Sequence, residues 1–305
     1  MAVTRMRFTG TGAGTHYIDL ARSISLQERK LHRQKKIYTV YGGFFVDTPS
    51  GSNVSRVNIN TAPNTWVTRR AVNRGFRLWK RMIAETIKNS DGGIQSGKWN
   101  DFKVYLNGTA TSGLLPKDAA GNDLYQAAAE WDISTLTTDD PGFDASGAPL
   151  PADQFELMIV GTKTGAAHDG TNPSGWTRIG LVDSWLNSRP TPESAGVPDN
   201  SPDGPADPLS NLFDSGDTDD DRIDIIEREG DAAPYDESSM FGMVSATNSG
   251  DHNLQRQSVV TTTSFQPTGP VHGFQALCGL IQIEVTAAEG AWELVLDVET
   301  VGESF

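Results

Sequence analysis

Apolar and polar residues alternate in several short segments after residue 36. The clearest are IYTVYGGFFVDT at residues 37–48 and SRVNIN at residues 55–60, where Val57 and Ile59 share one face. A period of two is typical of strands, because successive side chains point to opposite faces of a sheet. Further segments of this kind lie at residues 101–108, 154–162, 177–185, 257–265, 273–285 and 291–301. The pattern predicts an all-β protein of about eight strands.

One long segment has the helical period instead. Residues 65–88 follow Pro63, and Asn64 or Thr65 would serve as the N-cap. Apolar side chains recur every three or four residues, at Val72, Phe76, Trp79 and Ile83. A second stripe with the same spacing contains Arg70, Arg74, Arg77 and Arg81, offset by two residues. At about 100° per residue the two stripes lie on opposite faces, so we expect an amphipathic helix with an arginine face.

The first 36 residues suggest a basic N-terminal arm without clear periodicity. Its cationic end, LQERKLHRQKK, contains Arg29, Lys30, Arg33, Lys35 and Lys36. Such a cluster would contact nucleic acid or a neighbouring subunit, and the alternative is a solvated terminus. The domain following the arm would then span residues 37–305.

Two segments predict long loops. Residues 138–153 are rich in turn-forming residues, and residues 186–237 form a much longer acidic segment rich in Pro and Asp. Loops of this length are uncommon in compact domains, and they usually carry function or lack regular structure. We therefore treat 186–237 as an insertion.

Charge is distributed unevenly along the 305 residues. Residues 1–100 hold 17 Lys/Arg and 5 Asp/Glu, a net of +12, whereas the remainder holds 8 and 34, a net of -26; together they give -14. A basic segment followed by an acidic one suggests a polyanionic partner on one side of the molecule, although the two could also neutralise each other. The overall -14 disfavours a dedicated reader of nucleic-acid sequence. No segment reaches the roughly 18 apolar residues of a membrane-spanning helix, and the single cysteine, Cys278, excludes an internal disulfide.

The chain shows no catalytic signature. The acidic run at 214–229 invites a calcium site at Asp217, Asp219 and Asp221, but an EF-type loop would need Gly where Arg222 stands. A solvated acidic loop is therefore preferred, with Ca²⁺ as the alternative. Histidines are scattered without metal-binding spacing, and core packing is the default expectation for Trp66, Trp79, Trp176, Trp185 and Trp292.

Three segments together resemble the jelly-roll major capsid protein of a small icosahedral virus, such as those of environmental single-stranded DNA viruses or tailless phages. They are LQERKLHRQKK, the helix segment APNTWVTRRAVNRGFRLWKRM, and the late pair GFQALCGLIQIEV and AWELVLDVETV. They look like the arm, an inserted helix and the closing strands of such a coat. The resemblance implies one viral jelly-roll β-sandwich, and a double jelly roll stays open because short strands are easily missed.

The resemblance also implies a function. The chain would be a structural protein, not an enzyme, that assembles with itself through trimers or pentamers into an icosahedral shell. Its partners would be other copies, a viral nucleic acid and, in one variant, an internal membrane, with no small-molecule substrate and no cofactor. It would be made inside the host cell and reside in the virion.

A β-sandwich module that binds carbohydrate or a receptor is the alternative function. It would use loop aromatic residues and Ca²⁺ at the acidic loop, but it has no need of an arginine-striped helix. An enzyme of the glycoside hydrolase type would need two carboxylates facing one cleft, and no pair stands out in the sequence.

Overall fold

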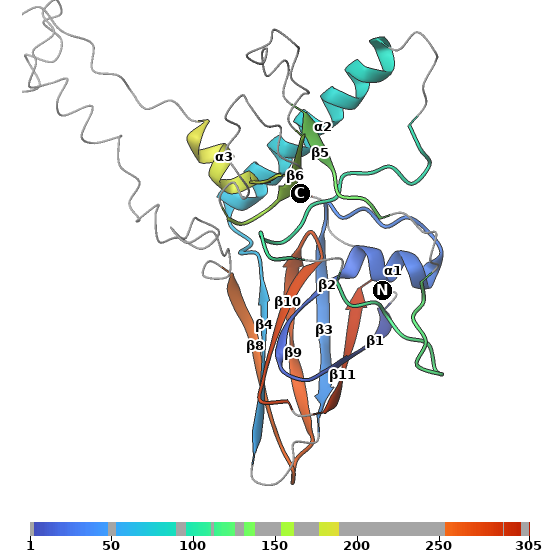
Figure 1. Cartoon of the computed structure of the whole chain (residues 1–305), viewed down its shortest axis with the longest axis vertical. Helices are drawn as coiled ribbons and strands as arrows, with labels where there is room; N and C mark the ends of the chain where they lie inside the picture. The colour runs from blue at the N-terminus through green and yellow to red at the C-terminus, as the bar shows by residue number, and fades with distance from the viewer. Residues whose placement is uncertain are drawn as a thin grey trace, which may run out of the picture.

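The structure is a computed structural model that describes residues 3–47, 53–89, 96–110, 113–125, 131–137, 154–161, 177–188, 254–288, 290–299 and 305. Two four-stranded antiparallel sheets form a β-sandwich (Figure 1). The first sheet has the order β1 (Val3–Thr11), β11 (Ala291–Glu299), β3 (Ile37–Val46) and β9 (Thr268–Leu277). The second has the order β2 (Gly14–Asp19), β10 (Leu280–Thr286), β4 (Val54–Thr61) and β8 (Gln255–Thr263). The expectation of a largely β protein built as a sandwich is confirmed.

A long insertion between β4 and β8 carries all the other described elements except α1. It contains α2 (Trp66–Asn89), β5 (Thr135–Thr137), β6 (Gln154–Met158), β7 (Thr177–Gly180) and α3 (Leu181–Asn187). The three strands form a small sheet in which β6 pairs antiparallel with β5 and parallel with β7. Figure 1 shows α2, α3 and this sheet above one end of the sandwich, while α1 (Leu20–Glu28), which connects β2 to β3, lies at the same end.

Two hydrophobic cores stabilise this arrangement. The first fills the sandwich with side chains from both sheets, including the fully buried Phe8, Phe45 and Ile59. The second lies under the insertion and joins α2 to the small sheet through residues such as Val72 and Leu157. Burial of apolar side chains is the main favourable contribution to folding, so the insertion is fixed to the sandwich by its own core.

The predicted arm is wrong for residues 3–28, which form β1, β2 and α1. Met6 and Phe8 point into the first core, whereas the alternate residues Arg5 and Arg7 pair with Asp297 and Glu293 of β11. The period of two is therefore present in RMRF, but the arginines on the outer face of the strand suggested a basic arm instead. Only residues 29–36 remain as a basic loop, between α1 and β3.

Most of the expected strands are present, with three corrections. Residues 101–108 form an irregular segment with one isolated bridge, between Tyr105 and Met158. The segment at 177–185 is a strand only to Gly180 and continues as α3, and 273–285 is a hairpin turning at Cys278 and Gly279. The expected helix is confirmed as α2.

Residues 113–125 lie along one side of the sandwich. Leu114 donates its backbone N–H to Tyr17 O at 2.6 Å, and Lys117 donates to Arg7 O at 2.8 Å. These bonds satisfy outer backbone groups of β2 and β1, which are the end strands of their sheets. The opposite side of the sandwich is formed by the end strands β8 and β9.

Candidate functional site

Helix α2 begins where the sequence predicts a cap. The Thr65 hydroxyl oxygen accepts the backbone N–H of Thr68 at 3.2 Å, which satisfies one of the unpaired donors of the first turn. Asn64 lies beside the cap and accepts a hydrogen bond from Arg69 at 2.6 Å. Thr65, rather than Asn64, is the N-cap.

The two faces of α2 are separated as the spacing predicts. Val72 and Trp79 are buried, and Phe76 and Trp79 meet Phe102 edge to face, with ring centroids 5.5 and 5.8 Å apart. Phe76 and Ile83 are partly buried against the same core. All four residues of the opposite stripe, Arg70, Arg74, Arg77 and Arg81, are exposed. The aromatic face therefore packs the helix against the core, while the arginine face is exposed and available to bind a partner.

These four arginines line a groove with a volume of ≈ 760 Å³, which we call the arginine groove. Its other lining residues are Lys35, Asn73, Phe76, Leu78, Trp185 and Phe305. Lys35 comes from the loop between α1 and β3, and Trp185 comes from α3. Segments far apart in the sequence thus supply one site, and five of its ten lining side chains carry a basic group.

Lys35 is held in place by a hydrogen bond and by two aromatic rings. Its ammonium donates to Phe305 O at 2.6 Å and lies 5.1 Å from the ring centroids of both Phe76 and Phe305. Burial lowers the pKa of Lys35, and the positive charge of Arg77 lowers it to a smaller extent. The cation is thus held against aromatic rings at the wall of the groove.

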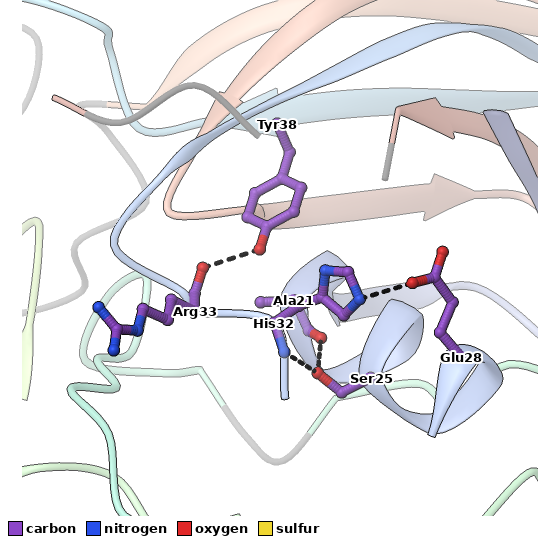
Figure 2. A network of polar contacts seen from close by, with 6 residues as sticks. All are labelled: Ala21, Ser25, Glu28, His32, Arg33 and Tyr38. Carbon is purple, nitrogen blue, oxygen red and sulfur yellow. Dashed lines mark hydrogen bonds and ion pairs between the residues drawn. The ribbon is translucent and has the colours of Figure 1, made fainter. Parts of the chain in front are cut away.

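The loop that carries Lys35 is fixed to α1 and to β3 by polar contacts (Figure 2). The Ser25 hydroxyl accepts the backbone N–H of His32 at 2.8 Å and donates to Ala21 O at 2.7 Å. The His32 ring contacts the Glu28 carboxylate at 2.8 Å, and the Tyr38 hydroxyl donates to Arg33 O at 2.7 Å. The basic loop is therefore an ordered part of the fold.

The remaining basic residues of this loop do not line the groove. Arg29, Lys30 and Arg33 are exposed, and Arg33 lies 3.6 Å from the Asp101 carboxylate. Lys36 is half-buried, and its carbonyl accepts the N–H of Cys278 at 2.8 Å. The structure thus joins one predicted loop residue to the helix stripe and leaves the other four outside the groove.

Two tryptophans were not predicted as part of a site: Trp185 lines the groove, and Trp66 lies beside it, in contact with the lining residues Trp185 and Arg70. Trp66 is 58% exposed, meets Trp185 edge to face at 5.5 Å, and lies 5.5 Å beneath the Arg70 guanidinium. Core packing is confirmed for Trp79 and Trp292 but is wrong for Trp66. The spacing could have predicted that Trp66 lies on the arginine face, because it stands four residues before Arg70 and so continues the arginine stripe.

Few carboxylates offset the positive charge of the groove. Arg81 pairs with Glu85 on the next turn at 2.8 Å. Among the residues that the structure describes, no ion pair is formed by Arg70, Arg74 or Arg77. An anion entering the groove would therefore meet guanidinium groups that are free to bind it.

Other candidate chemistry finds less support. Within the described ranges, no three His, Cys, Asp or Glu side chains lie close enough to hold a metal ion. Asp217, Asp219 and Asp221 lie outside those ranges, as do residues 138–153 and 189–237 of the expected loops. Cys278 is buried, and burial raises the pKa of its thiol, which disfavours the reactive thiolate. None of the described helices is long and apolar enough to cross a membrane.

Comparisons with protein-family models, with curated proteins and with solved structures find no match to this chain.

Proposed function

We propose that the chain is a jelly-roll coat protein that assembles with itself into a shell around a nucleic-acid genome. The order of the sandwich strands supports the jelly-roll part of this proposal. Numbered one to eight along the chain, they lie in the orders 1-8-3-6 and 2-7-4-5. Strand 1 pairs with 8, 2 with 7, 3 with 6 and 4 with 5, as when one long hairpin is rolled into two sheets. That arrangement is typical of jelly rolls, which recur in viral capsids, lectins and cupins.

The strand count supports a single jelly roll over a double one. The described residues contain one eight-stranded sandwich and a small three-stranded sheet, whereas two rolls would need about sixteen strands. The large insertion between the fourth and fifth sandwich strands contains α2 and α3, which supply most of the lining of the arginine groove.

A fold alone does not assign a function, so the choice of a coat depends on how the surface is divided. The arginine groove lies at the end of the sandwich where α2 follows β4. At the opposite end, the loop between β8 and β9 presents Phe265, whose side chain is 97% exposed. A cationic site at one end and a projecting aromatic residue at the other suit a subunit that contacts a polyanion and also contacts its neighbours.

A β-sandwich module that binds carbohydrate or a receptor remains the second candidate. Trp66 favours it, because an exposed indole also stacks on sugar rings. The arginine stripe counts against it, since a neutral sugar gains little from four guanidinium groups.

The test is the size of the purified full-length protein, measured by light scattering and negative-stain electron microscopy over a range of salt concentrations. Closed shells, or regular trimers or pentamers, would support the coat protein. A monomer of 32.9 kDa at every salt concentration would contradict it. Glycan binding by that monomer would then favour the second candidate.

A further inference from the structure

We propose that the arginine groove binds single-stranded nucleic acid, with phosphates along the arginine stripe and a base stacked on Trp66. The inference rests on the proposed coat function and deepens it, because it names the class of polyanion and the residues that hold it.

The phosphate half of the argument comes from the arrangement of the cations. Arg70, Arg74, Arg77 and Arg81 follow one face of α2 over about 16 Å, at about 1.5 Å per residue. Guanidinium groups bind phosphate oxygens through paired N–H donors, and a row of them follows a backbone rather than a single phosphate. Lys35, held against the rings of Phe76 and Phe305, adds a fifth cation.

The single-strand half comes from Trp66. This indole continues the arginine stripe at its first turn, and over half of its surface is exposed. Trp185 meets it edge to face and Arg70 lies over its ring, so the ring is positioned before any ligand arrives. A base in a duplex is already stacked between its neighbours, whereas an unpaired base can stack on an aromatic ring. Cations along a groove combined with an exposed aromatic ring are the common features of proteins that bind single strands without reading sequence.

The first experiment measures the binding of fluorescently labelled 20-nucleotide probes to the full chain by fluorescence anisotropy. The probes are oligo-dT, oligo-U and a DNA duplex of the same length. We expect both single strands to bind more tightly than the duplex at equal salt. The DNA and RNA probes show which of the two the groove prefers.

A pair of tryptophan variants tests the stacking. Trp66→Ala should weaken binding of the single strands by about 5-fold or more, the effect of losing one stacked base, without changing the salt dependence. Trp99→Ala is the matched control, because Trp99 is 48% exposed but, unlike Trp66, makes no ring contact with a groove-lining residue among those the structure describes. We expect the control to bind as the unmodified chain does. Equal binding by the two variants would overturn the stacking proposal.

A pair of charge variants tests the phosphate contacts. Arg74→Gln with Arg77→Gln should reduce the slope of log affinity against log salt by about 1.4, at about 0.7 for each phosphate contact of a single strand. Lys80→Gln with Lys88→Gln removes the same charge from exposed positions of the same helix outside the groove. We expect that control to change the slope much less, and equal slopes for the two double variants would contradict the assignment of the groove.

Four further outcomes are decisive. Duplex binding as tight as single-strand binding would overturn the preference for unpaired bases. Loss of oligomers in the Arg74/Arg77 variant without nucleic acid would show that the groove joins copies of the chain, and would also overturn the inference. Shells with no affinity for any probe would refute the groove as a nucleic-acid site but keep the coat function, whereas tight single-strand binding by a strict monomer would do the reverse.

Discussion

Asp19, where β2 meets α1, connects more of the structure than any sequence pattern indicated. Its carboxylate accepts the N–H of Arg22 at 3.1 Å, and so caps α1, and also accepts the indole N–H of Trp131 at 2.8 Å. Gln34, from the basic loop, donates to it at 3.1 Å and to Val104 O at 3.1 Å. Burial raises the pKa of Asp19, and the donated hydrogen bonds act against that rise. One side chain thus joins a strand, a helix, a loop and the insertion.

Asp19→Ala should lower the free energy of unfolding by about 2–4 kcal/mol, because it removes a helix cap and leaves the Trp131 and Gln34 donors without their acceptor. Denaturant unfolding measures the loss. Asp118→Ala is the control, since Asp118 is a half-buried carboxylate that accepts the N–H of Asn122 within a turn and, in the described part of the chain, joins no other element. An equal effect of the two substitutions would disprove the role given to Asp19.

The ion pair between Arg5 and Asp297 predicts how the free energy of unfolding changes in acid. Arg5 donates to both carboxylate oxygens, at 2.7 and 2.8 Å, and these hydrogen bonds hold the pKa of Asp297 below its ordinary value. A lowered folded-state pKa stabilises the protein above the ordinary carboxyl pKa near 3.8, and this contribution is lost as the pH falls through the lower value. Asp297→Asn should therefore make the loss of stability below pH ~4 less steep.

Urea unfolding at a series of pH values between neutrality and strong acid checks this. Arg5→Gln removes the other partner and should flatten the acid limb in the same way. A profile for either variant that is as steep as that of the unmodified chain would show that the pair does not contribute.

At the scale of elements, the position of α3 against α2 depends on Gly75. A Cβ atom at this position would lie 2.6 Å from Leu181 Cδ2 and 3.2 Å from Leu181 Cδ1. Glycine is unfavourable inside a helix by about 1 kcal/mol, so close approach of the two helices is the reason we give for its presence. Because Trp185 lies on α3, this contact also positions one wall of the arginine groove.

Gly75→Val should cost about 1–3 kcal/mol of stability, since the branched side chain would overfill the contact with Leu181. Ala84→Val, at an exposed position of α2, is the matched control and should cost less than about 1 kcal/mol. Combining Gly75→Val with Leu181→Ala should cost less than the sum of the single changes, because the smaller residue removes the clash. Additive effects in thermal unfolding would show that the two residues are not coupled.

The sequence predicted the elements best where burial and periodicity agree. Both faces of α2 followed from spacing, because an exposed arginine stripe and a buried aromatic stripe differ sharply in polarity. Residues 101–106 misled the prediction, since Phe102, Val104 and Leu106 alternate as in a strand but are buried under α2 without forming a ladder. Their backbone groups bond to different segments instead, such as Ser134 N to Lys103 O and Val160 N to Leu106 O. Alternation of polar and apolar residues indicates which side chains are buried, but a segment forms a strand only where its backbone pairs with another strand.

The candidate site was predictable only in part, because a groove is made by segments that the sequence does not show as neighbours. The stripe from Arg70 to Arg81 followed from one helix. The approach of Lys35 and Trp185 depends on the loop after α1 and on the packing of α3, which no local pattern encodes.

For the whole molecule, the two cores share the β9–β10 hairpin. Ala276 and Ile281 belong to the sandwich core, whereas Leu277, Cys278 and Leu280 between them belong to the core under the insertion. A substitution that disturbs the packing of one core should therefore also disturb the other, because both contain side chains of the β9–β10 turn. The sandwich and the described part of the insertion should unfold together.

Leu157→Ala tests this at the far side of the second core. Leu157 is fully buried, so its truncation should cost about 2–5 kcal/mol and speed hydrogen exchange in β11 of the sandwich as well as in β6. Leu78→Ala is the control, because Leu78 is 53% exposed. Faster exchange in β6 with no change in β11 would show two independent units.

The segment at 113–125 gives the sandwich two unlike flanks. It hydrogen-bonds to β1 and β2 through Lys117 and Leu114, whereas β8 and β9 end the sheets on the other flank. A side-by-side contact between copies that joined the β8–β9 flank of one to the covered flank of the next would be head-to-tail. Such a contact has a direction, and its repetition gives a ring where the rotation closes and an open filament where it does not, rather than a two-fold pair. The hydrogen bonds that cover the edges of β1 and β2 would thus set the direction in which successive subunits are added.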